Sequence, residues 1–289
     1  MPLDGAPHSR PGTLPALGTG SAFGPTKRMN LRRILVAAVW IAASLSWANG
    51  PSLDVCLPED ALPRASRATE QGFDIDVARL LAKELDRPLR VLWLPTPNLT
   101  DIESSDTDYR PLLRGQCNLM MSVPGASDIA DFGGALTLSQ PYYGASWEVF
   151  PADSSFNWQQ PYDGKVAVRA HTVGHRAVHE LGFDWTMQPD NLSIVDAVER
   201  GAASAGLVWG PSLGNLDVER KTNTDPPQAL RWNMHLAYQA DDEAMSSAVD
   251  TALSAPRVQD EIAALLEKHG IPRRGPFETV HTTEALNAL

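Results

Sequence analysis

The sequence predicts a mixed α/β fold of two lobes, each with a mostly parallel sheet flanked by helices. Two observations lead to this prediction. Strand, helix and strand patterns alternate from Leu53 to Leu94, and parallel strands joined by a helix need cover on both sheet faces. The order strand, helix, strand, helix, strand then returns between Lys165 and Trp209. The two halves share this order without sharing residue identity, so they are not a sequence repeat.

The first strand-helix-strand unit organises the chain. Residues 53–57 form an apolar run that is followed by a polar loop with prolines. We expect Asp74 to cap the helix that follows, because its carboxylate can accept from free first-turn amides. Apolar residues recur along this helix at three- and four-residue spacing and form one apolar face, at Val77, Ala78, Leu81 and Leu85. Pro88 ends the helix, and residues 89–94 are predicted to form the second strand.

The remaining elements follow in chain order. Residues 109–114 predict a short helical turn, 118–123 a strand, 124–139 a loop, and the aromatic run 141–150 a strand that leaves one lobe and enters the other. In the second half we expect strands at 165–169, 185–188, 206–209 and 231–238, and helices at 173–181, 194–200 (capped by Ser193), 241–253 and 257–269.

The length and composition suit this arrangement. The 289 residues are 43% hydrophobic and 20% charged, which is typical of a globular protein with room for two modest domains. We predict an N-terminal extension and signal peptide at 1–48, a first lobe at 51–147 with 233–275, and a second lobe at 148–232. Residues 276–289 are predicted to be a polar tail.

An export signal is predicted from Met29 onward. Arg32 and Arg33 precede an apolar core at 34–45, and small residues favour cleavage after Ala48. The apolar run is shorter than the roughly 20 residues of a membrane span, although a retained N-terminal anchor is the alternative. Residues 1–28 are rich in Pro, Gly and Ser. This composition fits a translation start that was assigned too far upstream, with Met29 as the true first residue. We therefore predict a periplasmic protein.

The formal net charge is −11. The export segment holds five of the basic residues and only Asp4 of the acidic ones, so the mature chain is more acidic still. Phosphate binding needs a basic face, and this charge argues against a nucleic-acid partner.

Cys56 and Cys117 are the two cysteines of the sequence. An even number of cysteines in an oxidising compartment makes them a candidate disulfide between two predicted strands. The alternative is two separate buried thiols. No C-x-x-C-H occurs, so no c-type haem is expected.

Other polar clusters are weaker candidates for a functional site. The loop at 96–108 has four carboxylates but lacks the alternation and central glycine of a calcium-binding EF-hand, so we expect a solvated loop. His171, His175 and His179 recur every four residues without an H-E-x-x-H motif, and surface histidines are the preferred interpretation. No metal and no cofactor are predicted. A G-x-S-x-G elbow is also absent, and we predict that the protein is not an enzyme.

Candidate ligand residues come from loops at the carboxyl ends of strands, where open α/β sheets bind ligands. In the first lobe, acceptors or a solvated loop are expected at Glu59 and Asp60, and backbone amides could approach a ligand beside Ser122 and Gly125. Tyr142 could stack on a ligand or pack the hinge. In the second lobe the candidates are Arg169, His171, Thr172 and Trp209.

The ordered series of segments resembles a known family. GFDIDVARLLAKELDRPLRVLW, LLRGQCNLMMSVPG and LSQPYYGASWEV are similar to the first lobe of bacterial extracellular solute-binding proteins of family 3, the receptors of polar-amino-acid ABC importers. KVAVRAHTVGHRAVHEL and AVERGAASAGLVWG are similar to their second lobe. The resemblance covers about Leu53 to Pro272, and no single motif within it is diagnostic. It implies a type II periplasmic-binding-protein fold with hinge strands between the lobes.

A subgroup is closer in some features. Cys56, Cys117, VWGP at 208–211 and the closing EIAALLEKHGIP resemble the J component encoded with periplasmic quinoprotein alcohol dehydrogenases. This resemblance implies an accessory role beside a PQQ-dependent dehydrogenase.

The chain departs from the family at both charged anchors. Amino-acid receptors place an arginine after the SVPG-like turn as a carboxylate clamp, but no arginine lies between Arg114 and Arg169, and Asp128 and Asp131 stand there instead. The second-lobe aspartate that holds the ammonium falls near Trp209, where no carboxylate occurs. Ordinary α-amino acids are therefore not the predicted ligand.

Two functions follow as predictions. The first is a monomeric periplasmic protein that closes its lobes around a small solute and presents it to an ABC permease. The alternative is an accessory protein that binds a periplasmic quinoprotein dehydrogenase.

Overall fold

The computed structural model describes residues 51–95, 108–151, 156–218 and 225–289, which belong to one compact unit. The predicted signal peptide and most of the acidic loop, residues 96–107, lie outside the described residues. In the described part of the chain, no helix has the length and apolarity needed to cross a membrane.

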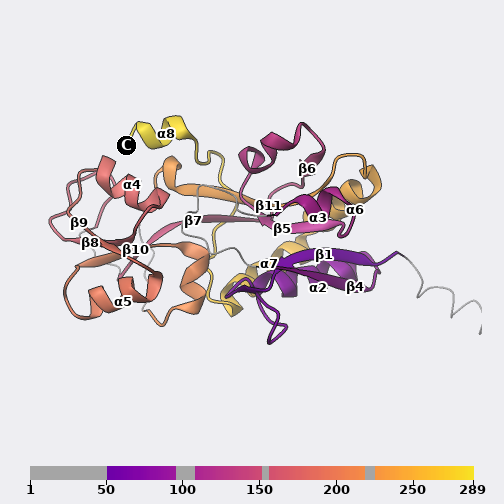
Figure 1. Ribbon diagram of the computed structural model, residues 1–289, viewed down its shortest axis with the longest axis horizontal. Helices are drawn as coiled ribbons and strands as arrows, with labels where there is room; N and C mark the ends of the chain where they lie inside the picture. Colours follow the sequence, from indigo (N-terminus) through magenta and orange to yellow (C-terminus); the bar gives the residue numbers. More distant parts are fainter. Residues whose placement is uncertain (1–50, 96–107, 152–155, 219–224) are drawn as a thin grey trace, which may run out of the picture. The chain divides into compact units, whose positions relative to one another are not determined.

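Nine of the described strands form one continuous mixed sheet (Figure 1), and two short strands form a separate sheet of their own. On one side β1 (Leu53–Pro58) pairs in parallel with β4 (Leu89–Leu94) and β5 (Leu119–Val123). On the other side β8 (Val166–Arg169) pairs in parallel with β9 (Trp185–Gln188) and β10 (Ala205–Trp209). Two long strands, β7 (Tyr143–Phe150) and β11 (Arg231–Gln239), join the two sides and pair antiparallel with each other. The predicted alternation of strand and helix in each half is confirmed.

Helices and short elements complete the fold. The helices are α2 (Phe73–Glu84), α3 (Arg110–Leu113), α4 (Val173–Glu180), α5 (Asn191–Glu199), α6 (Glu243–Ser254), α7 (Pro256–Lys268) and α8 (Thr283–Asn287). The 3-10 turns are η2 (Ala126–Phe132), η3 (Gly210–Asn215) and η4 (Gln228–Leu230), and the short strands are β2 (Asp60–Ala61), β3 (Ala65–Ser66) and β6 (Leu136–Leu138).

Helix α2 begins one residue before the predicted cap. Gly72 occupies the N-cap position with a φ of 141°, and a Cβ there would lie 2.2 Å from the carbonyl oxygen of Arg64. Only glycine fits this backbone, because it lacks the Cβ that would collide. Asp74 is therefore inside the first turn, and its carboxylate makes no cap bond. The prediction of Asp74 as N-cap was wrong.

Three further details differ from the sequence predictions. Asp190, not Ser193, caps α5, and its side chain accepts from the backbone N–H of Ser193. The loop predicted at 124–139 contains η2 and β6, which are too short for periodicity to reveal. The predicted polar tail contains α8, which buries Leu286 to 1% exposure.

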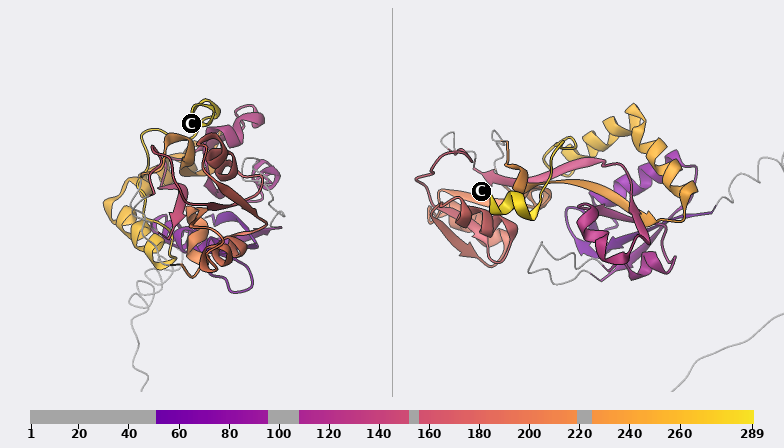
Figure 2. Two further views of the ribbon diagram at one scale, coloured as in Figure 1. Left: turned by 90° about the vertical axis from the view of Figure 1, so that its left-hand side faces the viewer. Right: turned by 90° about the horizontal axis from the view of Figure 1, so that it is seen from above.

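The two long strands pass from one hydrophobic core to another. In β7, Tyr143 and Ala145 belong to the core built on α2, α6 and α7, whereas Trp147 and Val149 belong to the core built on α4 and β8. In β11, Met234 lies in the first of these cores, while Leu230, just before the strand, lies in the second. The view from above in Figure 2 shows both strands running between the two groups of helices. These strands hold the positions that the prediction gave to the hinge.

Cys56 and Cys117 form a disulfide, so the prediction of a bridge is confirmed. The bond joins β1 to the residue two positions before β5, and both cysteines are buried in a small cluster with Tyr109, Leu112 and Met120. The disulfide closes a separation of 61 residues within the first half of the sheet.

Candidate functional site

Four side chains meet where β5 ends and the chain enters β7. Asp74 is fully buried and accepts a hydrogen bond from the Ser122 hydroxyl over 2.7 Å and one from Nε of Arg64 over 2.9 Å. The hydroxyl groups of Ser122 and Tyr142 are also hydrogen-bonded, over 2.9 Å. We name Arg64, Asp74, Ser122 and Tyr142 the Asp74 cluster.

Each member of the Asp74 cluster comes from a different element. Asp74 is the second residue of α2, Ser122 lies near the end of β5, Tyr142 precedes β7, and Arg64 precedes β3. Ser122 has a φ of 55°, in the left-handed region that serine rarely adopts. Strained backbone of this kind is concentrated at functional sites, where the surrounding structure holds it in place.

The electrostatics of the cluster keep Tyr142 and its neighbour Tyr143 neutral. Burial, followed by the nearby charge of Asp74, raises the pKa of both Tyr142 and Tyr143 above the ordinary range. Burial lowers the pKa of Arg64, but the charge of Asp74, the two tyrosines and the hydrogen bond to Asp74 together outweigh it, and the net shift is upward. Arg64 and Asp74 therefore compensate each other. The cluster offers neutral hydroxyl groups, and the buried hydroxyl of the neighbouring Tyr143 has no hydrogen-bond partner among the described residues.

Two of the predicted first-lobe residues, Ser122 and Tyr142, belong to this cluster. Gly125 follows three residues after Ser122, with a φ of 147° and no atom within 4 Å of an added Cβ. Glu59 directly follows β1 and pairs at the surface with Arg67 over 3.4 Å, and Asp60 is exposed on β2. Thus Glu59 makes the surface contact that its solvated-loop interpretation describes, while its ligand role stays a prediction.

Three of the predicted second-lobe residues lie together after β8. Thr172 is buried and caps α4, because its hydroxyl oxygen accepts from the His175 N–H over 3.1 Å and donates to the Arg169 carbonyl over 2.9 Å. His171 is exposed with a φ of 58°, and Arg169 ends β8. This strand end therefore mirrors the end of β5, with a left-handed residue beside a buried hydroxyl.

The fourth second-lobe residue, Trp209, lies between aromatic neighbours. Its ring meets those of Trp147 at 6.3 Å and Trp232 at 5.2 Å, both edge to face, and it packs against both large cores. The contacts in the structure are packing contacts beside the crossing strands. A ligand contact for Trp209 stays a prediction.

Sequence reasoning missed Arg64, Asp74 and Asp128. Arg64 is one of several charged residues in a polar loop, and Asp74 was assigned to a helix cap. Asp128 lies on η2, just after β5, where burial raises its pKa to about 6. The available signal was the placement of Asp128 where the family has a cationic clamp, but burial of its carboxyl could not be deduced from the sequence.

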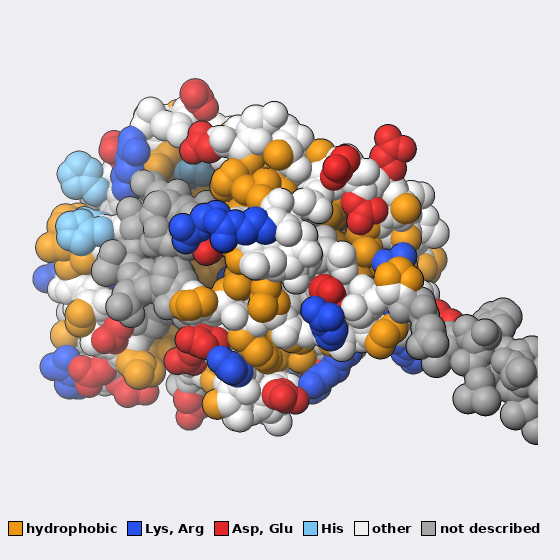
Figure 3. All heavy atoms as spheres, turned by 45° about the vertical axis from the view of Figure 1, so that its right-hand side comes forward, with side chains coloured by type: hydrophobic (Ala, Val, Ile, Leu, Met, Phe, Trp, Pro, Cys, Tyr) orange, Lys and Arg blue, Asp and Glu red, His pale blue; other side chains and the backbone are white. Residues whose placement is uncertain are grey.

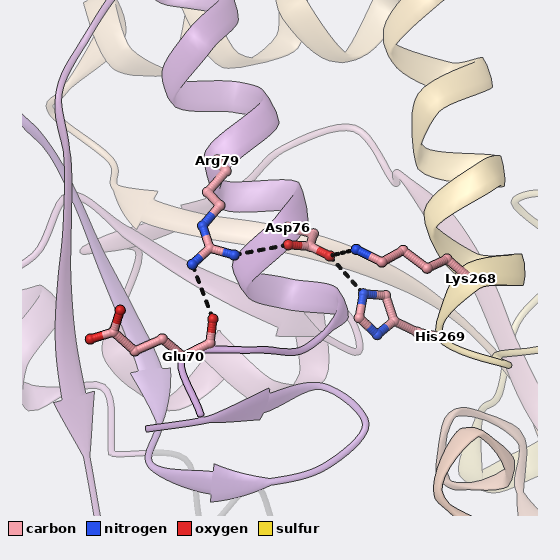
Figure 4. A network of polar contacts seen from close by, with 5 residues as sticks. All are labelled: Glu70, Asp76, Arg79, Lys268 and His269. Atoms are coloured by element: carbon pink, nitrogen blue, oxygen red, sulfur yellow. Dashed lines mark hydrogen bonds and ion pairs between the residues drawn. The ribbon is translucent and has the colours of Figure 1, made fainter. Parts of the chain in front are cut away.

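A charged network joins α2 to the end of α7 (Figure 4). Asp76 accepts hydrogen bonds from Lys268 over 2.7 Å, from His269 over 2.8 Å and from Arg79 over 3.0 Å. Burial opposes its ionisation, but these donors prevail and lower its pKa. A hollow of about 400 Å³ lies beside this network, floored by Leu80, Ala264 and Leu265. Four of the charged side chains that line it, Asp76, Arg79, Glu261 and Lys268, form ion pairs within the chain, so we do not assign a ligand there.

The described residues include no group of three or more His, Cys, Asp or Glu side chains placed to hold a metal ion. His175 instead packs against Trp185, with ring centres 4.7 Å apart, and burial lowers its pKa. Figure 3 shows acidic and basic side chains interspersed over the face it presents, so this face carries no field of a single sign.

Comparison with protein-family models and with curated proteins finds no match. Solved structures do match. MxaJ from Methlophaga aminisulfidivorans MPT has a TM-score of 0.59 at 22% identity, covering 77% of this chain and 100% of that one. The L-cystine solute receptor of Neisseria gonorrhoeae, in its unliganded open conformation, has a TM-score of 0.62 at 15% identity, covering 81% and 99%. The periplasmic binding protein XoxJ from Methylobacterium extorquens AM1 has a TM-score of 0.53 at 17% identity, covering 78% and 100%. This chain has the two-lobed fold of the periplasmic solute-binding proteins.

Proposed function

We propose that this protein is an exported, periplasmic solute-binding protein that captures a small ligand between two lobes. The observation that carries the proposal is the passage of β7 and β11 between two separate hydrophobic cores. Strands that join two cores can flex while each core stays intact, which is how hinge closure around a ligand works. The similarity in fold to the L-cystine receptor supports the same function. The lobes would comprise 51–147 with 233–275, and 148–232.

The ligand would bind at the two strand ends. On the first lobe this end is the Asp74 cluster with Gly125, Glu59 and Asp60, and on the second it is the segment from Arg169 to Thr172. Open α/β sheets bind ligands outside the carboxyl ends of their strands. Each end holds a left-handed residue, Ser122 or His171, with buried hydroxyl groups beside it.

The ligand would not be an ordinary α-amino acid. No arginine follows β5 as a clamp, and Nε of Arg64, the arginine of the Asp74 cluster, is bonded to Asp74. No carboxylate stands at Trp209 for the ammonium group. The charges of Arg64 and Asp74 compensate each other within the cluster. We therefore expect the ligand to be bound by hydrogen bonds from uncharged groups. No nucleophile or acid–base pair stands out at this site, and we propose binding without catalysis.

An accessory protein of a periplasmic quinoprotein dehydrogenase is the alternative. The sequence resembles the J component of that system, and two of the similar structures, MxaJ and XoxJ, are of the J type. The partner would then be the dehydrogenase in place of an ABC permease. The fold similarity is common to both functions and does not rank one above the other.

The test is native mass spectrometry of the protein purified from periplasm, followed by calorimetry and thermal shift. A retained small molecule would support solute capture, and its addition at 100 times Kd should stabilise the fold by about 2.7 kcal/mol. Arg169→Ala should weaken binding, while Arg200→Ala, an exposed arginine paired with Asp196, should not. Co-purified dehydrogenase without any small molecule would favour the alternative. Micromolar binding of a common amino acid would contradict the proposed ligand class.

A further inference from the structure

The C-terminal residues lie across the two strands that connect the cores. Ile271 is still buried in the first core, and Leu286 is buried in the second. Between them the chain crosses β7 and β11, as the yellow segment of Figure 2 shows. Residues 274–286 are thus a third connection between the two cores, in addition to the two strands.

The crossing occurs at one cross-strand pair. Gly144 of β7 lies opposite Asn233 of β11, and both residues bind the segment through hydrogen bonds. The Gly144 N–H donates to the Arg274 carbonyl over 3.0 Å. The Asn233 side chain donates to the Phe277 carbonyl over 2.9 Å and accepts from the Phe277 N–H over 2.7 Å. The segment is fixed where the strands pass from one core to the other.

Close packing and charge reinforce this crossing. A Cβ on Gly144 would lie 2.3 Å from the Gly275 carbonyl oxygen and 2.8 Å from the Phe277 ring. The Arg274 guanidinium donates two hydrogen bonds to Glu148, a buried residue of β7, over 3.0 and 2.9 Å. A bidentate arginine–carboxylate pair of this kind also restricts orientation.

Beyond the crossing the segment follows β11 into the second core. The His281 ring stacks on Trp232 with centres 4.5 Å apart, and the backbone N–H of His281 donates to the Arg231 carbonyl over 2.7 Å. Thr282 then caps α8, whose Leu286 enters the second core. Both ends of the segment are therefore anchored by burial, and bending β7 and β11 at Gly144 and Asn233 must disturb its middle.

We propose that residues 274–286 are a strap that limits bending of β7 and β11 and so restricts the relative motion of the two cores. Motion about a hinge requires changes in a few backbone torsions. Such changes are opposed at Gly144 and Asn233, where both strands pass from one core to the other. The opposing contacts are the hydrogen bonds of Arg274 and Phe277, the ion pair between Arg274 and Glu148, and the close packing against Gly144. The inference does not depend on any ligand.

The test measures how widely the two cores vary in separation. Spin labels are placed at Lys83→Cys on α2 and Glu199→Cys on α5, both exposed, and both native cysteines are held in the disulfide, so labelling is specific. Electron–electron resonance then gives the distribution of distances. Asn233→Leu keeps the size of the side chain but removes both bonds to Phe277. We expect a broader distribution, and about tenfold faster hydrogen exchange of the Gly144 amide.

Two further proteins make the result decisive. The double variant Glu148→Gln with Arg274→Gln neutralises both partners together, which avoids leaving an unpaired buried charge. Asn118→Leu is the matched control, because Asn118 also accepts a backbone N–H, that of Asp54, but lies within the first half of the sheet. Broadening in either strap variant with an unchanged Asn118→Leu supports the strap. Equal widths in all four proteins would overturn it.

Discussion

The hydroxyl of Ser122 and the carboxylate of Asp74 lie 2.7 Å apart, although 48 residues separate them in the chain. The bond joins the end of β5 to the first turn of α2, and Asp74 also binds Arg64. A buried carboxylate is stable only with such partners. Ser122 is therefore both a candidate ligand residue and part of the support of the fold, and substitutions there need a stability measurement beside any binding measurement.

Removal of Arg64 should destabilise the protein. Arg64→Ala leaves the fully buried Asp74 with Ser122 as its remaining bonded partner, and breaking one side of a buried pair costs about 3–5 kcal/mol. The double variant with Asp74→Ala should lose less, because no buried charge remains. Urea unfolding measures both. Arg67→Ala is the control, since its pair with Glu59 is exposed and should contribute less than about 1 kcal/mol. Equal losses for Arg64→Ala and Arg67→Ala would contradict the cluster.

Asp128 should make stability depend on pH. Its folded pKa of about 6 lies above the ordinary value of 3.8 because the carboxyl is buried. The unfolded chain therefore loses this proton first, and the contribution of the neutral carboxyl is full below about pH 4 and is lost as the pH rises through 6. Asp128→Asn should match the native protein at pH 4 and exceed its Tm at pH 7. Asp131→Asn, an exposed neighbour, should show no such change. An NMR titration of Asp128 with a midpoint near 4 would refute this.

Asp76 should give stability the opposite dependence on pH. Its lowered pKa means that the folded state favours the carboxylate, so its contribution is present above about pH 4 and is lost as the pH falls through the folded pKa. Asp76→Asn should lower Tm at pH 7, and this loss should become smaller as the pH falls below about 4. Asp196→Asn, which removes an exposed pair with Arg200, is the control. Thermal melts across this pH range measure both, and a loss that is equal at pH 7 and pH 3 would count against the network.

The disulfide should stabilise the first half of the sheet. A crosslink over 61 residues restricts the unfolded chain, and the chain-entropy model gives about 4 kcal/mol for a loop of this length. Cys56→Ala with Cys117→Ala should lose this amount in urea unfolding. Reductant should lower the stability of the native protein and leave the double variant unchanged. Equal stability of the oxidised and reduced native protein would exclude the effect.

The alternation of strands and helices could be predicted from the sequence because it is a local property. Apolar spacing places β4 and β9 at their observed residues, and parity and compartment indicate the Cys56–Cys117 pair. Helix caps could not be predicted in the same way, because Asp74 and Ser193 each have suitable side chains but do not occupy the N-cap position. A backbone that only Gly72 can adopt decided the first, and the nearby Asp190 decided the second.

The contacts that define the candidate site and the strap were decided by the tertiary structure alone. Arg64, Asp74, Ser122 and Tyr142 are brought together only when α2, β5 and β7 pack, and the sequence gives no separate signal for that meeting. The residues after Gly275 have a polar composition that predicts a tail. Phe277 and Leu286 have binding partners only because β7 and β11 already lie side by side beneath them. Sequence determined the elements and the two-lobed plan, since these depend on neighbouring residues, while long-range packing determined which charges are paired and which motions are restrained.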